Sequence, residues 1–167
     1  MKKLIVLPNI LTAILLSACS ESKNTPKGEF LLGNLYADLI ESGETYYMVL
    51  PIEWTGDEPA DITSVELVKE DGDPVTFEKD GIAYEFHGAD PLKQTGLYSG
   101  EHDIGRIENI GEFQVQGEGR IVAKVLLGEV KEDESRQAKI TFRTDDREYG
   151  EVVEWDTFKQ LSTILDS

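Results

Sequence analysis

Two histidines with acidic neighbours are the first residues in this sequence that could carry chemistry. His87 lies three residues before Asp90, and His102 directly precedes Asp103. An imidazole beside a carboxylate can act as a general acid or base, or the two can bind a metal ion. Their spacing requires neither role, and the G-x-S-x-G and H-E-x-x-H signatures are missing. We therefore expect a protein that is not an enzyme, with an enzyme using His87 or His102 and these carboxylates as one alternative.

Acidic residues gather in four segments that we expect to be loops: 57–61, 70–73, 132–134 and 145–146. Calcium takes six to eight hard oxygen ligands, which facing acidic loops of a sandwich can supply. The run from Asp71 to Asp73 departs from the EF-hand pattern in the place of its glycine and in lacking a suitably spaced glutamate. The calcium candidates are Asp57, Asp61, Asp71 and Asp73, and the alternative is that these residues only form solubilising turns. A calcium-responsive structural or adhesion domain is thus a second functional hypothesis, and no other cofactor is expected.

The N-terminal segment has the composition of a secretory signal peptide. Lys2 and Lys3 precede a stretch over residues 4–16 that is apolar except for Pro8, Asn9 and Thr12. This stretch is shorter than the about 20 residues that a membrane-spanning helix needs. We expect residues 1–18 to be cleaved from the mature protein.

The single cysteine follows this segment, in the run Leu16-Ser17-Ala18-Cys19. The run resembles the lipobox of bacterial prolipoproteins, in which leucine and two small residues precede the cysteine that receives the lipid. The resemblance implies diacylglyceryl transfer to the Cys19 sulfur, cleavage before Cys19 and anchoring of the mature N-terminus in a membrane. Two acyl chains exceed the single chain that binds a membrane only reversibly, so this anchor would be stable. The alternative is an ordinary signal peptide with a chance cysteine.

The overall charge narrows the classes of partner. Asp and Glu outnumber Lys and Arg by 33 to 16, which gives a formal net charge of -17 over 167 residues. Nucleic acid is excluded as an expected partner, because its binding depends on clustered Lys and Arg. One cysteine also excludes an internal disulfide framework. We divide the chain into a signal peptide (1–18), a lipidated cysteine with a flexible tether (19–29) and one folded domain (30–167).

Short segments rich in Val, Ile, Tyr and Phe, separated by Gly, Pro and Asp, predict an all-β fold. The predicted strands cover residues 30–39, 45–54, 62–69, 75–79, 82–87, 111–116, 120–131, 136–144 and 148–155. Turn residues predict a hairpin at Asp80-Gly81 and an antiparallel four-stranded meander over residues 111–155, with turns at 117–119, 132–135 and Asp145-Asp146. At the C-terminus, Asp156 as an N-cap and the spacing of Phe158, Leu161 and Leu165 predict one short amphipathic helix.

Residues 30–155 resemble the immunoglobulin-like sandwiches of bacterial surfaces in strand number and spacing. The resemblance implies two packed antiparallel sheets with Trp54 buried between them, but without the paired cysteines of antibody domains. The expected fold class is therefore an all-β antiparallel sandwich, immunoglobulin-like, with a short C-terminal helix.

Binding segments are harder to locate. Adjacent strand residues point to opposite faces, so one of Tyr46 and Tyr47 should be exposed. Residues 88–101 form the longest stretch without clear periodicity, and we interpret it as an interaction loop that uses Leu92, Leu97 and Tyr98, or else as a connector.

The leading hypothesis for the function of this protein is a lipid-anchored, extracytoplasmic module that binds or assists another protein of the cell envelope.

Overall fold

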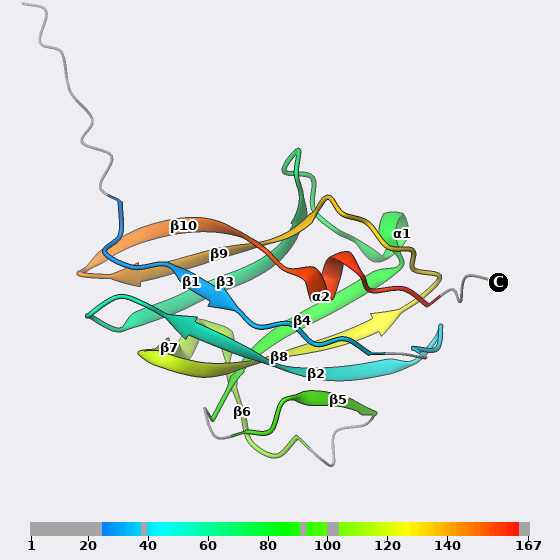
Figure 1. Cartoon of the computed structure of the whole chain (residues 1–167), viewed down its shortest axis with the longest axis horizontal. Coiled ribbons are helices and arrows are strands. Elements are labelled where there is room, and N and C mark those ends of the chain that lie inside the picture. The colour runs from blue at the N-terminus through cyan, green and yellow to red at the C-terminus, as the bar shows by residue number, and fades with distance from the viewer. Residues whose placement is uncertain (1–24, 38–39, 91–92, 100–103, 164–167) are drawn as a thin grey trace, which may run out of the picture.

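The folded part of the chain consists of two antiparallel sheets packed face to face (Figure 1). The computed structural model describes residues 25–37, 40–90, 93–99 and 104–163. Cys19, Leu92, His102 and Asp103 lie outside the described residues. The prediction of an all-β antiparallel sandwich with a short helix near the C-terminus is confirmed.

The larger sheet, called sheet A, has β2 and β8 at its centre. Its strands are β1 (Phe30–Leu32), β2 (Thr45–Trp54), β8 (Gly117–Leu127), β4 (Ile82–Ala89) and β6 (Ile107–Asn109), in this order, with β5 (Gly96–Ser99) also paired to β2. Strand β8 pairs with the whole length of β2, so β1 and β5 share the other edge. Strand β1 pairs with residues 52–54 of that edge, and β5 with residues 46–49.

The smaller sheet, called sheet B, runs in the order β10 (Arg147–Glu154), β9 (Arg136–Thr144), β3 (Ala60–Lys69) and β7 (Phe113–Val115). The register of β3 against β9 shifts between Ile62 and Ser64, which marks a β-bulge. Strands β5 and β6 fall in segments for which the sequence predicted no strand. They are short, and only one of them, β5, carries large apolar side chains on both faces.

The main core lies between the two sheets. Every second residue of β2 from Met48 to Trp54 points into it, and these side chains are at most 2% exposed. Phe30, Trp54 and Phe142 form an aromatic cluster with ring centroids 4.8 to 5.1 Å apart. The burial predicted for Trp54 is found, and its indole N–H donates to the Glu58 carbonyl at 2.7 Å.

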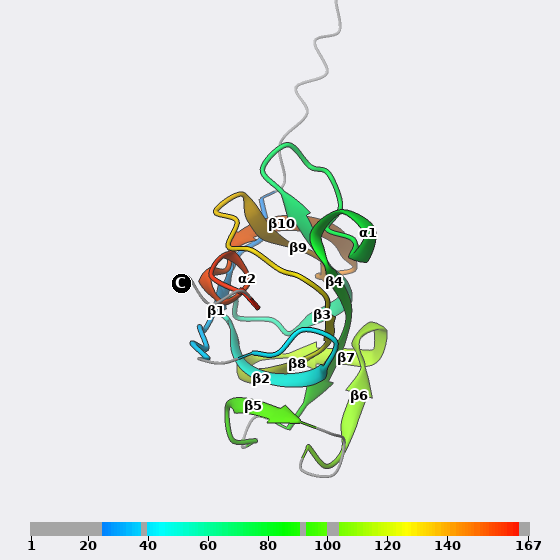
Figure 2. The ribbon, with the colours of Figure 1, turned by 90° about the vertical axis from the view of Figure 1, so that its right-hand side faces the viewer.

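A second, smaller apolar cluster lies on the opposite face of sheet A. It contains Tyr47, Val49, Ala89, Ile104 and Val122, with Tyr98 and Ile107 packed against it. Strands β5 and β6 lie on the side of β2 and β8 that faces away from sheet B (Figure 2). The prediction that one of the adjacent tyrosines is exposed is therefore wrong: Tyr46 packs in the main core and Tyr47 in this second cluster.

The segment predicted as a strand over residues 75–79 is a helical turn instead. Helix α1 (Phe77–Asp80) begins where the Thr76 side chain accepts the N–H of Lys79, and it ends at Gly81, whose φ is 70°. Asp80-Gly81 is thus the end of a helix that connects sheet B to sheet A, and the predicted hairpin is wrong. Helix α2 (Asp156–Lys159) is confirmed as an element but is one turn long, and its N-cap is Trp155 rather than Asp156.

The predicted four-stranded meander is also wrong in its pairing. Strand β7 pairs with β3 in sheet B, whereas β8 pairs with β2 and β4 in sheet A. Residues 117–119, predicted as a turn, are instead the first residues of β8, so the chain passes from sheet B to sheet A at Gln116. The connection that contains residues 132–135 carries it back to sheet B. Only the hairpin at Asp145-Asp146 is confirmed, and both residues have positive φ, 52° and 59°, as a tight hairpin turn of this hand requires.

A buried aspartate and two half-buried charged residues connect α1 to the connection between β8 and β9. Lys69 Nζ lies 2.7 Å from Asp80 Oδ1 and 3.3 Å from Asp133 Oδ2. Arg136 is 2% exposed and donates to the carbonyls of Phe158, Leu161 and Lys131. Two hydrogen bonds from Ser135, with help from Lys69, lower the pKa of Asp133 to about 2 against the opposing effect of partial burial.

Candidate functional site

The predicted calcium candidates do not come together. Asp57 precedes β3 and Asp61 lies at its start, whereas Asp71 and Asp73 follow its other end. Asp61 accepts a hydrogen bond from the Gln114 side chain at 2.7 Å. Asp71 accepts the Asp73 N–H, and Asp73 pairs with Lys79 at 3.5 Å. Among the described residues, no three His, Cys, Asp or Glu side chains are grouped so that they could hold a metal ion.

His87 lies on β4 beside a cavity of about 370 Å³, which β3, β6 and the turn after β6 complete. Its Nε2 is 3.4 Å from Glu85 Oε1, two residues earlier on the same strand face. Ser64, Glu108 and Asn109 also line this cavity. The structure thus places the His87 imidazole beside the Glu85 carboxylate. Of the other residues predicted for this site, Asp90 directly follows β4, and His102 and Asp103 lie outside the described residues.

The predicted interaction residues are used largely within the fold. Leu97 packs against the main core and Tyr98 against the second cluster, because β5 pairs with β2 and sends alternate side chains to opposite faces. The Tyr98 hydroxyl donates to the Gln94 carbonyl at 3.2 Å. Residues 93–99 therefore cover part of sheet A.

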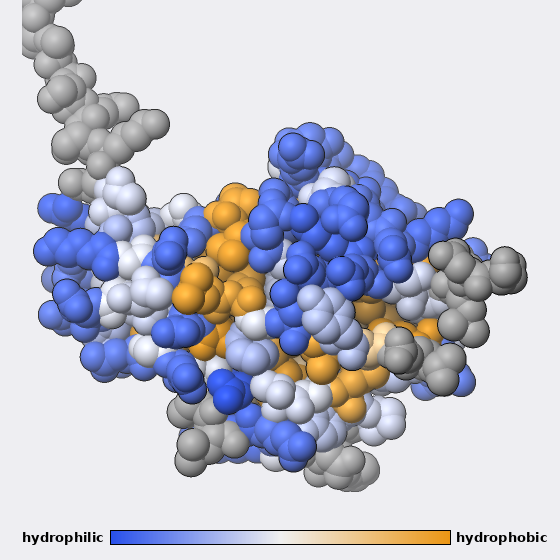
Figure 3. All heavy atoms as spheres, in the orientation of Figure 1, coloured by the Kyte–Doolittle hydropathy of each residue, from blue (hydrophilic) through white to orange (hydrophobic). Residues whose placement is uncertain are grey.

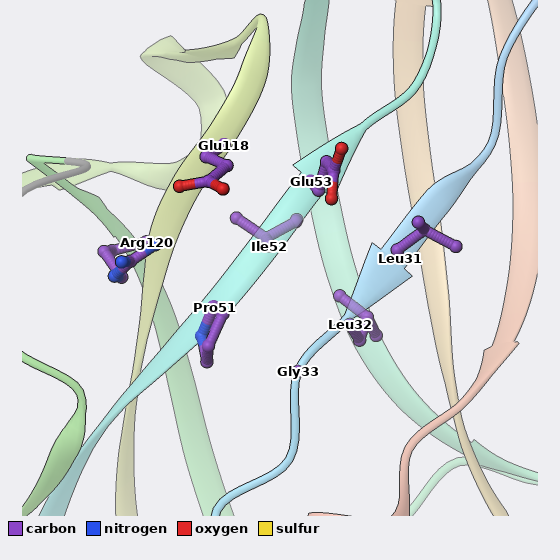
Figure 4. Close-up of a pocket in the computed structure, with 8 residues that line it drawn as sticks. All are labelled: Leu31, Leu32, Gly33, Pro51, Ile52, Glu53, Glu118 and Arg120. Atoms are coloured by element: carbon purple, nitrogen blue, oxygen red, sulfur yellow. The ribbon is translucent and has the colours of Figure 1, made fainter.

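The outer face of sheet A is left open beside this cover, and there it forms a groove that the sequence did not predict. The groove has a volume of about 290 Å³ and lies across β1, β2 and β8 (Figure 4). Its lining consists of Leu31, Leu32, Gly33, Pro51, Ile52, Glu53, Glu118 and Arg120. We call it the β1 groove.

Strand register arranges the groove residues in two rows. Glu118, Glu53 and Leu31 lie opposite one another on β8, β2 and β1, and form the first row. Arg120 and Pro51 form the second row, which Gly33 completes through the hydrogen bond from its N–H to the Pro51 carbonyl. Figure 4 shows Glu118 and Glu53 side by side toward one end of the groove and Pro51 toward the other.

Proline and glycine together create the hollow. Gly33 donates its N–H to the Pro51 carbonyl at 2.9 Å, but Pro51 has no N–H to return. The Gly33 carbonyl instead accepts the indole N–H of Trp155 at 3.0 Å, which links β1 to the C-terminal helix. A Cβ on Gly33 would lie 2.6 Å from the Pro51 ring, so only glycine fits there without a shift.

The two ends of the groove differ in charge. Glu53 and Glu118 are exposed and directly opposite each other, an arrangement that destabilises a sheet through repulsion. At the other end, Arg120 donates to the carbonyls of Lys93 and Gly119 at 3.0 and 2.8 Å. The first of these bonds links the Arg120 guanidinium to the 93–99 cover, and the glutamates at the acidic end are the more exposed side chains.

Strand β1 is also fixed on its other side. The Phe30 N–H donates to both carboxylate oxygens of Glu151 on β10, at 3.3 and 3.2 Å. Burial of Glu151 raises the pKa of its carboxyl group, and this hydrogen bond opposes the rise. Apolar atoms gather on the surface over β1 and β10, between hydrophilic regions (Figure 3). Leu31 is 47% exposed and Val152 is 55% exposed.

A scan against protein-family models finds no match for this chain, and a search of curated proteins finds none either. In the part of the chain that the structure describes, no helix is long and apolar enough to cross a bilayer.

Proposed function

We propose that this chain is a bacterial lipoprotein anchored through Cys19, and that its sandwich domain binds or assists another protein of the cell envelope. The observation that carries the proposal is the position of the β1 groove, which opens on the first strand after the predicted tether. Its side chains offer apolar surface and carboxylates, a combination suited to binding a segment of another protein.

The short tether determines where the partner must be. The chain from Cys19 to Thr25, the first described residue, can extend at most about 20 Å. From Glu29 onward the chain is hydrogen-bonded to the sandwich, because the Glu29 carbonyl accepts the Thr55 N–H and the Glu29 N–H donates to the Thr55 hydroxyl. A domain anchored in this way keeps the β1 groove close to the membrane surface, within reach of membrane-proximal segments of other proteins.

The proposal is tested with the full chain in its bacterial host, fed an alkyne-labelled fatty acid. Wild-type protein should carry the label and sediment with membranes, whereas Cys19→Ala should carry none, and Ser20→Ala serves as the matched control. Mild cross-linking of intact cells should recover one specific protein with the lipidated form and less of it with Cys19→Ala. Equal labelling of the wild type and Cys19→Ala would disprove the anchor, and loss of every specific cross-link would disprove the accessory role.

A further inference from the structure

We propose that the β1 groove binds an extended, basic segment of a partner protein, in which a Lys or Arg side chain lies between Glu53 and Glu118 and an apolar side chain covers Gly33 and Pro51. This inference deepens the proposed function and rests on it for the identity of the partner as an envelope protein. The occupant is defined by the chemistry of the groove.

The negative charge of the groove determines the first side chain of this occupant, which must be cationic. Glu53 and Glu118 are exposed and in direct register on neighbouring strands, where like charges repel. A cationic side chain between them removes that repulsion and gains two charge-assisted hydrogen bonds. Arg120 does not fill this role, because its Nε and Nη1 donate to the backbone carbonyls of Lys93 and Gly119.

Shape selects the second part. The row formed by Arg120, Pro51 and Gly33 is low, because Gly33 has no side chain and Pro51 has only its ring. Leu31 stands beside it with 47% of its surface exposed. An apolar side chain placed over this row and against Leu31 removes apolar surface of both partners from water, which favours binding. In an extended segment, residues i and i+2 point to the same face about 7 Å apart, so one strand can present both groups.

The net charge argues against a second copy of this chain as the occupant. Each copy carries a formal charge of -17, and both copies would bring carboxylates to the interface. A basic segment from another protein is attracted by the same field. Attraction of this kind weakens as salt screens it.

The test uses the full chain in uncharged maltoside micelles, with backbone amide NMR as the measurement. The probe is the blocked peptide Lys-Ser-Leu-Ser-Lys, and its matched controls are Glu-Ser-Leu-Ser-Glu and Lys-Ser-Ser-Ser-Lys. We expect the probe to shift amides of β1, β2 and β8, with a Kd at least tenfold below that of the acidic peptide and fivefold below that of the peptide without leucine.

Variants locate the binding. The double substitution Glu53→Gln/Glu118→Gln should raise the Kd for the probe at least fivefold, and Leu31→Ser should raise it at least threefold. The control is the double substitution Glu70→Gln/Glu78→Gln, which makes the same change in net charge on two exposed residues, one directly after β3 and one in α1. It should change the Kd less than twofold. If either double variant loses its folded spectrum, the single substitutions Glu118→Gln and Glu70→Gln replace it.

Four results would overturn the proposal: equal affinity for the basic and acidic peptides, equal loss of affinity in the two double variants, no shift at 10 mM probe, or groove shifts that depend only on protein concentration. The last result would identify a second copy as the occupant. Because the peptide assay does not involve the Cys19 lipid, failure of the groove proposal can be distinguished from failure of the anchor proposal. Peptide binding without fatty-acid labelling would leave the groove and remove the anchor.

Discussion

Gly33 shows how one missing side chain both permits a strand and creates a surface. Its ideal Cβ would lie 2.6 to 2.9 Å from three atoms of the Pro51 ring. We expect Gly33→Ala to lower the free energy of unfolding by about 1–3 kcal/mol, because the added methyl group must displace a proline held in a central strand. Urea denaturation of the full chain in micelles measures this.

Gly150 provides the matched control, since no atom lies within 4 Å of its ideal Cβ. Gly150→Ala on β10 should leave stability unchanged or raise it by up to about 1 kcal/mol, through the lower entropy of the unfolded chain. Equal destabilisation by both substitutions would show that steric contact with Pro51 is not the cause.

Asp133 makes a pH-dependent contribution to stability. Its pKa of about 2 lies below the ordinary value of 3.8, so its carboxylate favours the folded state above pH 4 and loses this effect as the pH falls toward 2. We expect Asp133→Asn to cost about 1 kcal/mol at pH 7, after allowance for solvent screening. The difference from the wild type should shrink between pH 4 and pH 2.

Chemical denaturation at a series of pH values tests this. Asp57→Asn, at an exposed position, should change stability by less than about 0.5 kcal/mol. A difference between wild type and Asp133→Asn that stayed constant from pH 7 to pH 2 would show that the charge of Asp133 is not what stabilises the fold.

Among the secondary-structure elements, the β9–β10 hairpin has a turn that the sequence predicts correctly. The two residues at this turn nevertheless adopt a backbone conformation that is unfavourable for them. Asp145 and Asp146 both have positive φ, where glycine is more stable than an L side chain. We expect Asp146→Gly to raise the free energy of unfolding by about 0.5–1 kcal/mol, measured by thermal and urea denaturation. Asp57→Gly, where φ is not positive, should lower it by a few tenths of a kcal/mol. A destabilised Asp146→Gly would mean that the Asp146 side chain makes contacts that outweigh the backbone strain.

The same hairpin shows what the sequence could predict about the fold. Alternating residues such as Ala138, Ile140 and Phe142 identify β9, and Asp-Asp identifies the turn, because both signals are local. Pairing across the sandwich is not local. The glycine-rich run after β7 resembles a hairpin turn in sequence, yet Gly117, with φ 69°, is already the first residue of β8 in the other sheet. Sheet assignment depends on which faces are buried against each other, and alternation alone does not contain that information.

The β1 groove could not be predicted from the sequence for the same reason. Glu53 and Glu118 are 65 positions apart, and only the β2–β8 register brings them together. The one available signal was Pro51 inside a predicted strand, which argues for a gap in strand pairing at that point. The sequence did single out His87, but the carboxylate that lies beside it is that of Glu85, which the sequence did not indicate.

At the scale of the whole molecule, a formal charge of -17 makes the fold sensitive to ionic strength. Screening of self-repulsion should raise the Tm when NaCl is increased from 10 to 200 mM. Calcium must be tested against this background. Because Asp57 and Asp61 lie at the opposite end of β3 from Asp71 and Asp73, we expect CaCl2 and MgCl2 at matched ionic strength to give Tm values within about 1 °C of each other.

A specific calcium site gives a different result. Binding to the native state alone at 100 times the Kd adds about 2.7 kcal/mol, which for a chain of this size raises the Tm by roughly 5–10 °C. If calcium exceeds magnesium by that margin, Asp57→Asn/Asp61→Asn and Asp71→Asn/Asp73→Asn identify the end of β3 that binds it. The effect would disappear in one double variant and persist in the other, and the calcium-responsive function would then replace the binding module as the better account of this acidic domain.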